Sequence, residues 1–163
     1  MHASVAAHLG SRQVARVIYG AIIGLALIVA LQGHPPSAAA MVGWLLGTAV
    51  AVGLAEFYAE VVGAETRERH RVTRAQLEEM VEEAGAVALG IVFPVIFFVL
   101  AAVGLIGLDT AFSVAKWSGL GLIGFYGFWA ARFAGARVAA AVLQGAAVAL
   151  IGAGLILLKA LLH

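Results

Sequence analysis

The sequence of 163 residues contains no cysteine, and only 12% of its residues carry a charge. The absence of cysteine excludes disulfides, thiolate chemistry and cysteine-ligated zinc. Soluble domains carry about 25% charged residues, so the low share of charge argues against an ordinary soluble domain. The net charge of +1 is too small to indicate a nucleic-acid partner.

Signatures of catalysis and nucleotide binding are also missing from the sequence. It has no Ser/His/Asp arrangement, no HExxH string and no glycine-rich phosphate loop. The glycines at 119–127 lie in apolar sequence and follow no predicted strand. We therefore predict that the protein is not an enzyme and needs no organic cofactor.

Long apolar runs dominate what is present. Hydrophobic residues make up 63% of the chain, and its mean hydropathy is +1.03. Several runs reach the length of about 20 residues that a membrane-spanning helix needs, and they do not alternate as barrel strands do. The sequence predicts an all-α, polytopic membrane protein that forms one domain over residues 1–163 in the lipid bilayer.

We predict five membrane spans joined by short loops and one longer insertion. The spans cover residues 14–31, 38–63, 86–108, 110–133 and 135–161. Pro35 and Pro36 end the first span, and Pro94 should kink the third because proline cannot continue the helical hydrogen-bond ladder. The charged residues 64–85 form a cytoplasmic helical segment between the second and third spans.

Cationic side chains predict the orientation. One side of the predicted membrane collects eight arginines, and the other has only Lys116 and Lys159. The arginines are Arg12, Arg16, Arg67, Arg69, Arg71, Arg74, Arg132 and Arg137. Because cytoplasmic loops carry the excess of Lys and Arg, we place the N-terminus in the cytoplasm and the C-terminus on the opposite side. The composition suits a bacterial cytoplasmic membrane.

The helical insertion carries its own start signal. Thr73 and Gln76 have the spacing of a capping box, which predicts that a helix begins at Arg74. We expect a short amphipathic helix near the membrane surface, which Gly85 either ends or hinges into the third span.

Two carboxylates lie inside the apolar part of the second span. Glu56 and Glu60 are one helical turn apart and therefore share a face. A carboxylate at this depth is costly unless it is paired, hydrated or protonated, and paired oxygen ligands suit a divalent cation or a proton relay. The structural alternative is that Glu60 reaches the headgroups while Glu56 pairs with a cytoplasmic arginine such as Arg132.

A second acidic group occupies the insertion and forms a candidate cytoplasmic metal site. Its members are Glu65, Glu68, Glu78, Glu79, Glu82, Glu83 and, as a softer ligand, Met80. Like charges at i,i+4 spacing repel one another on a helix, and a bound cation would relieve that repulsion. The alternative is a solvated acidic face that pairs with the arginines of residues 67–74.

Small residues give one further signal. Gly43 and Gly47 form a GxxxG spacing, which lets two helix backbones approach closely. The spacing fits packing among the helices of one chain, and it also fits a seam between two copies.

Four strings together resemble the vacuolar iron transporter family. VIYGAIIGLALIVAL (17–31) is similar to the family's first helix, and AVGLAEFYA (51–59) to its second. LGIVFPVIFFVL (89–100) resembles the third helix with its central proline, and FAGARVAAAVLQGAAVALIGAGLIL (133–157) resembles the last loop and helix. Glu56 matches a polar position of the family, whereas Ile23 stands where the family has its first-helix Asp.

The resemblance implies a homodimer of five-span chains that carries a divalent metal ion. Fe²⁺, Mn²⁺ and Zn²⁺ are the candidate substrates, with exchange for protons as one mode of coupling. On this interpretation Glu56 and Glu60 form the membrane ion site, and the acidic insertion is the cytoplasmic receiving site. The alternative is a non-transporting membrane protein that binds a protein partner or lipid and whose carboxylates are structural.

Overall fold

Six α-helices and no β-strand make up the described part of the chain. The computed structural model describes residues 12–161, with side chains for 13–150 and 153–154. The helices are α2 (Arg12–Gln32), α3 (Ala38–Glu68), α4 (Arg74–Val92), α5 (Val95–Ala102), α6 (Leu108–Phe133) and α7 (Val138–Leu161). The all-α prediction is confirmed.

α3 is longer than the predicted second span, residues 38–63. It begins after Ser37, whose Oγ accepts a hydrogen bond from the Ala40 N–H at 3.2 Å. It ends at Arg69, which adopts a left-handed conformation with φ of 57°. The 31 residues of α3 extend over about 46 Å, so the helix exceeds the roughly 30 Å thickness of a bilayer's hydrocarbon core.

α4 begins where the sequence predicts but continues further. The Thr73 backbone N–H donates to Gln76 Oε1 at 2.8 Å, which completes the predicted capping box. The helix then runs through Gly85 without a break to Val92. The expectation of a short, separate amphipathic helix ending or hinging at Gly85 is therefore wrong. Because glycine only weakens a helix by about 1 kcal/mol, packing of the flanking residues is enough to keep α4 continuous.

Pro94 interrupts the predicted third span, residues 86–108. It has no backbone N–H with which to continue the ladder of α4. α4 and α5 lie on either side of it and are bent by 45° relative to each other. The predicted kink at Pro94 is confirmed.

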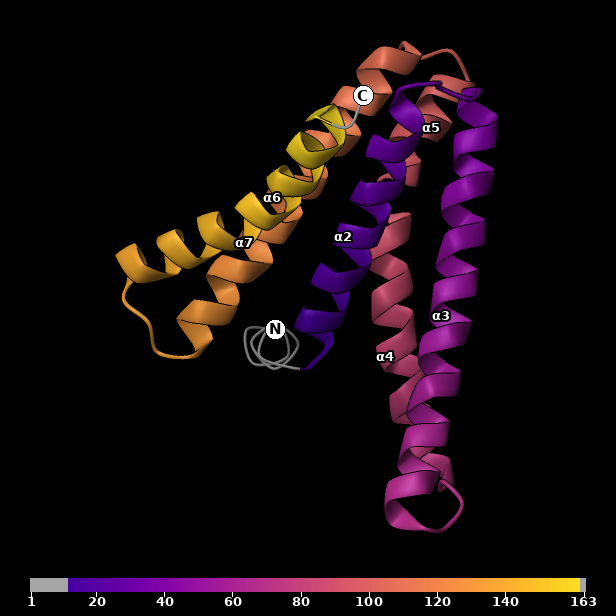
Figure 1. Cartoon of the computed structure of the whole chain (residues 1–163), viewed down its shortest axis with the longest axis vertical. Coiled ribbons are helices and arrows are strands. Elements are labelled where there is room, and N and C mark those ends of the chain that lie inside the picture. Colours follow the sequence, from indigo (N-terminus) through magenta and orange to yellow (C-terminus); the bar gives the residue numbers. More distant parts are fainter. Residues whose placement is uncertain (1–11, 162–163) are drawn as a thin grey trace.

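Figure 1 shows two groups of helices. α2, α3 and α4 run side by side, and α5 continues from α4 toward the end where α2 connects to α3. α6 and α7 form a hairpin that packs against α2 and splays away from α3. The turn between α3 and α4 projects from the opposite end of the molecule (Figure 1). The termini of α2, α3 and α4 nearest that turn carry the charged side chains discussed below.

The main core lies at the α5 end of this bundle. Side chains from α2 through α6 contribute to it, among them the fully buried Ile28, Leu45 and Ile91. Phe98 of α5 and Phe112 of α6 meet edge to face with ring centroids 5.0 Å apart. This core fixes the apolar end of the bundle, so that the helices reach the charged end at set positions.

Glycines bring α2 directly against α4. A Cβ added at Gly90 would lie 2.6 Å from the backbone nitrogen of Ala21, and Gly20 and Gly24 face the α4 backbone in the same way. Side-chain carbons do not tolerate such distances, so only glycine allows this crossing. The close approach also sets Arg16, one turn before Gly20 on α2, beside α4.

Gly43 and Gly47 do not pack against any other part of the chain that the structure describes. No described atom lies within 4 Å of the position that a Cβ would take at either residue. Trp44 between them is exposed as well. The GxxxG spacing thus faces outward, and its role as a seam between two copies stays a prediction.

The apolar length of the helices is compatible with membrane integration. α2 over Gln13–Gln32 and α3 could each cross a membrane, and the bent α4–α5 pair could form a third span. Over their described residues, α6 and α7 do not meet the same criterion of length and hydropathy. The prediction of five spans therefore stays a prediction.

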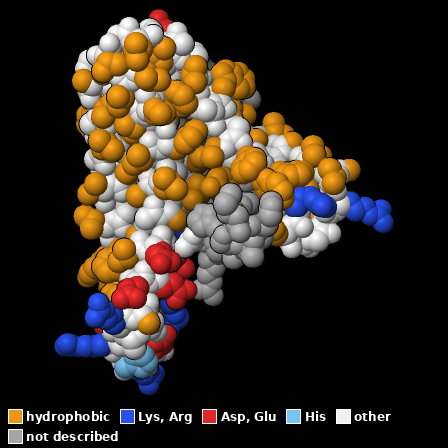
Figure 2. Space-filling view, turned by 180° about the vertical axis from the view of Figure 1, so that it is seen from behind, with side chains coloured by type: hydrophobic (Ala, Val, Ile, Leu, Met, Phe, Trp, Pro, Cys, Tyr) orange, Lys and Arg blue, Asp and Glu red, His pale blue; other side chains and the backbone are white. Residues whose placement is uncertain are grey.

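The surface divides into an apolar body and a charged tip. In Figure 2, hydrophobic side chains cover the body, and acidic and basic side chains gather at the α3–α4 turn. Further basic side chains lie at the far end of the α6–α7 hairpin. Along α3 the exposed apolar side chains include Trp44, Val50, Leu54 and Tyr58. An exposed apolar surface of this extent is unfavourable in water and suits contact with lipid.

A matched pair of glycine substitutions in α4 tests the close crossing. Gly90→Ala should lower the free energy of unfolding by about 1–3 kcal/mol, because its methyl group would overlap the α2 backbone. Gly85→Ala, in open space on the same helix, should be neutral or raise it by about 0.5–1 kcal/mol. Thermal unfolding in detergent micelles measures both, and equal effects of the two substitutions would contradict the observed crossing.

Candidate functional site

Arg16 stands at the centre of an ion-pair cluster that joins three helices. Its NH1 nitrogen contacts Glu56 of α3. Its NH2 nitrogen lies 2.5 Å from Oε1 of Glu60, also on α3, and 2.8 Å from Oε2 of Glu83 on α4. We call these four side chains the Arg16 cluster.

Local structure brings the four groups together. The i,i+4 spacing puts Glu56 and Glu60 on one face of α3. Glu83 lies on the buried face of α4, between Met80 and Val87. The glycine crossing then holds α2 close enough to α4 for the Arg16 side chain to reach all three carboxylates. One member of the predicted cytoplasmic group, Glu83, therefore joins Glu56 and Glu60 in one cluster.

The cluster is shielded from solvent to a considerable degree. The side chain of Arg16 is 23% exposed, that of Glu56 20%, that of Glu60 29% and that of Glu83 only 10%. Three carboxylates face one guanidinium, so the four side chains carry a formal charge of −2 when all are ionised. Partial burial strengthens both the attraction to Arg16 and the repulsion among the carboxylates, since the effective dielectric constant falls below that of water.

A polar cleft of about 150 Å³ adjoins the cluster between α3 and α4. Glu60 and Glu83 line both the cleft and the cluster. The other lining residues come from the turn ends of the two helices and are Ala64, Arg67, Glu68, Gln76, Glu79 and Met80. Four of the side chains that line the cleft are acidic, and one, Arg67, is basic. The excess of negative charge therefore extends from the turn to the cluster.

The remaining predicted site residues lie outside the cleft. Glu78 is exposed and pairs with Arg74 at 3.3 Å. Glu82 accepts a hydrogen bond from Gln13 at 3.3 Å. Glu65 is exposed on α3, and its backbone oxygen accepts the capping hydrogen bond from the Arg69 N–H. Of the predicted cytoplasmic set, Glu68, Glu79, Glu83 and Met80 are thus brought together, and these three are not.

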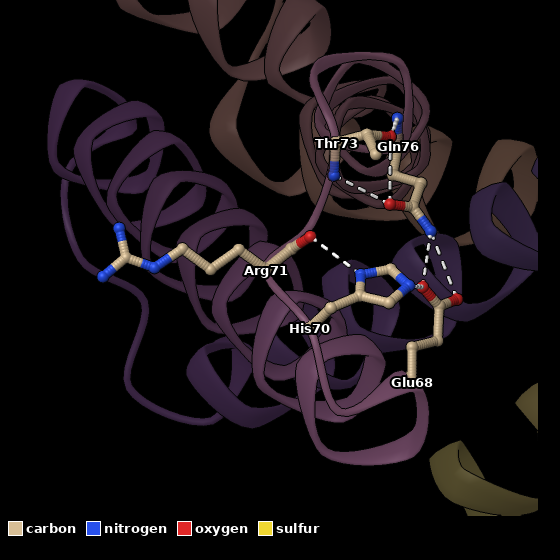
Figure 3. A network of polar contacts seen from close by, with 5 residues as sticks. All are labelled: Glu68, His70, Arg71, Thr73 and Gln76. Carbon is tan, nitrogen blue, oxygen red and sulfur yellow. Dashed lines mark hydrogen bonds and ion pairs between the residues drawn. The ribbon is translucent and has the colours of Figure 1, made fainter.

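A hydrogen-bonded network rigidifies the turn at the mouth of the cleft (Figure 3). Nε2 of Gln76 donates to both carboxylate oxygens of Glu68, at 3.2 and 3.0 Å. The His70 ring lies between the Glu68 carboxylate and the Arg71 carbonyl group. Its Nε2 is 3.3 Å from Glu68, and its Nδ1 is 3.0 Å from the Arg71 carbonyl oxygen. In Figure 3 the Arg71 side chain points away from this network. Glu68 is therefore held by one partner in the turn, His70, and by one in α4, Gln76.

The partner of the membrane carboxylates was not identified from the sequence. Glu56 does pair with an arginine, as the structural alternative predicts, but that arginine is Arg16. The example Arg132 is wrong, because its NH1 donates to the Ala136 carbonyl oxygen at 2.6 Å. In the sequence, Arg16 lies 44 positions from Glu60 and 67 positions from Glu83. The available signal was the position of Arg16, which lies inside the first span rather than before it.

The cation that these carboxylates bind in the structure is the Arg16 guanidinium. No group of three or more His, Asp or Glu side chains in the described residues stands ready to ligate a metal ion. Binding an external cation at these carboxylates would therefore require the Arg16 contacts to change. The oxygens are hard ligands suited to divalent cations, and they lie beside a polar cleft that is large enough for several water molecules.

Comparison with known proteins adds no family. No protein-family model, no curated protein and no solved structure matches the chain. Inference about its function therefore rests on the Arg16 cluster and the cleft beside it.

Arg16 should matter more for stability than any one carboxylate. Arg16→Gln leaves three carboxylates facing one another, whereas Glu60→Gln leaves the guanidinium with two partners. We expect Arg16→Gln to lower the free energy of unfolding by about 1–3 kcal/mol, below the figure for fully buried pairs because the groups stay partly solvated. Glu60→Gln should change it by less than about 1 kcal/mol.

Thermal unfolding in detergent micelles, followed by circular dichroism, measures this difference. Arg71→Gln is the matched control, because Arg71 is an exposed arginine of the α3–α4 turn. It should leave stability within about 0.5 kcal/mol of the unsubstituted protein. A loss for Glu60→Gln as large as that for Arg16→Gln would show that the excess of carboxylates has no energetic consequence.

Proposed function

We propose that the protein is a small membrane carrier of a divalent metal ion. The observation that carries the proposal is the partly buried cluster in which three carboxylates share one guanidinium. Carboxylates with too few cationic partners inside a helical bundle are costly unless a cation or protons neutralise them. Fe²⁺, Mn²⁺ and Zn²⁺ are the candidate substrates, and protons released from or taken up by the cluster would provide coupling.

The route to the cluster is the polar cleft between α3 and α4. Glu68 and Glu79 line its outer part, and Glu60 and Glu83 connect it to the Arg16 cluster. A chain of carboxylates attracts cations and raises their local concentration. Met80 adds a thioether, a softer ligand that favours transition metals over Mg²⁺ and Ca²⁺. The cleft would thus serve as the cytoplasmic receiving site, and the cluster as the site within the membrane.

We further propose five spans with the N-terminus in the cytoplasm, as in the family that the sequence resembles, and assembly as a homodimer. In support, the α3–α4 turn and the α6–α7 loop lie toward the same end of the molecule as the start of α2 (Figure 1), and this end carries the arginines. The outward-facing Gly43 and Gly47 support a seam between copies. α6, at 26 residues, is long enough for a span, although its polar residues lower its hydropathy.

Single cysteines can map this topology, because the chain has none of its own. Arg71→Cys and Arg137→Cys should react with a membrane-impermeant maleimide only from the cytoplasmic side. His34→Cys and Asp109→Cys should react only from the opposite side. Labelling of intact cells measures reaction from the outside, and labelling of inverted membrane vesicles measures reaction from the cytoplasmic side. Reaction of His34→Cys and Arg71→Cys from the same side would rule out the proposed arrangement.

Uptake by reconstituted vesicles tests transport directly. The unsubstituted protein should admit Mn²⁺ to liposomes that contain a metal-quenched dye. The double substitution Glu56→Gln with Glu60→Gln should reduce the initial rate by about tenfold or more, because it removes two anionic ligands. Asp109→Asn is the matched control, since Asp109 is an exposed carboxylate in the first turn of α6, and its rate should be unchanged. Equal rates for the double variant and the control would refute the mechanism.

A second candidate function is a non-transporting membrane protein with structural carboxylates. The observation in its favour is that Arg16 contacts all three carboxylates of the cluster. Such a protein would bind a partner or lipid through its exposed apolar surface. It predicts no uptake above that of empty liposomes and no stabilisation of the protein by micromolar Mn²⁺, Fe²⁺ or Zn²⁺.

A further inference from the structure

Arg16 presents a cationic group to oxygens that a metal ion would also need. NH1 contacts Glu56, and NH2 lies 2.5 Å from Glu60 and 2.8 Å from Glu83. The guanidinium thus stands among all three carboxylates of the cluster. A metal ion ligated by them would have to sit at 2.0–2.6 Å from the same oxygens, where it would collide with the guanidinium or be repelled by it.

We propose that Arg16 is a tethered competitor of the transported cation. It fills the cluster while no cargo is bound, and it leaves when a divalent cation binds Glu56, Glu60 and Glu83. The inference rests on the proposed function and adds the regulation of its binding site. Arg16 would keep the carboxylates paired in the unloaded protein and would set the concentration at which a cation can enter.

The exchange is physically feasible both for the incoming cation and for the displaced Arg16 side chain. A divalent cation brings twice the charge of the guanidinium and approaches the oxygens more closely, so it can displace it. The displaced side chain has somewhere to go, because it is 23% exposed in its present position and arginine has a long, flexible stem that can carry its charge to water. The acidic cleft beside the cluster, with Glu68 and Glu79, offers new partners.

Displacement of Arg16 would also weaken the contact between α2 and α3. α2 packs along α4 and α6 and has little contact with α3. The Arg16 contacts with Glu56 and Glu60 therefore provide a polar link between α2 and α3. Cargo binding would break that link, which gives the carrier a means of coupling occupancy to movement of α2.

Titration with Mn²⁺ tests the competition. In Arg16→Gln, Mn²⁺ should bind more tightly than in the unsubstituted protein, on the order of tenfold, because a positive charge has left the site. Arg16→Lys keeps the charge and should stay within about threefold of the unsubstituted protein. Calorimetry on purified protein in nanodiscs measures the affinities. Binding by Arg16→Gln that is equal to or weaker than that of the unsubstituted protein would overturn the inference.

A measurement on the unsubstituted protein covers the case in which Arg16→Gln does not fold. Phenylglyoxal modifies accessible arginines, and mass spectrometry reports the extent at each one. Saturating Mn²⁺ should increase modification of Arg16 by several-fold and leave that of Arg71 unchanged, because only Arg16 is displaced. Unchanged or reduced modification of Arg16 would show that metal and guanidinium do not compete.

These results separate the inference from the proposed function. Mn²⁺ binding to the unsubstituted protein without a gain in Arg16→Gln, or without exposure of Arg16, overturns the competition and leaves the carrier standing. Absence of Mn²⁺ binding and uptake in every variant overturns the carrier and the inference with it. Binding that appears only in Arg16→Gln supports the competition most strongly, because it shows Arg16 closing a site that is otherwise competent.

Discussion

The ion pairs of Arg16 determine how the charged end of the molecule is arranged. Glu56, Glu60 and Glu83 would repel one another if α3 and α4 brought them together without a cation, and each is largely removed from solvent. One guanidinium offers five N–H donors in a planar fork, so it can serve acceptors on two helices at once. Through this one side chain, α2 therefore holds carboxylates of both α3 and α4.

Backbone geometry makes that contact possible. An arginine on α2 reaches the carboxylate on α4 because Gly20 and Gly90 let the two helices touch through their backbones. At the other end of the bundle, the core around Phe98 and Phe112 fixes the helices by apolar packing. The molecule therefore combines a rigid apolar end with a charged end whose geometry depends on electrostatics.

Local sequence signals predicted local structure well. The capping box of Thr73 and Gln76 and the break at Pro94 follow from backbone hydrogen bonding within a few residues. The continuity of α4 through Gly85 could not be read in this way, because tertiary packing outweighs the modest cost of a glycine. Arg16 and Glu83 are 67 positions apart in the sequence. Spacing rules along one helix carry no information on which helices lie next to each other. For that reason the sequence did not predict that Glu83 meets Glu56 and Glu60, or that Arg16 lies among the three carboxylates.

The first helix raises the sharpest question about mechanism. At Ile23 this helix carries an apolar side chain, which packs against the apolar core. Two turns earlier on the same face, α2 supplies Arg16 instead. The helix thus contributes a positive charge to the carboxylates that we propose as the ion site. If the protein carries a cation through this site, the charge of Arg16 opposes binding of that cation, so displacement of Arg16 would favour loading of the site.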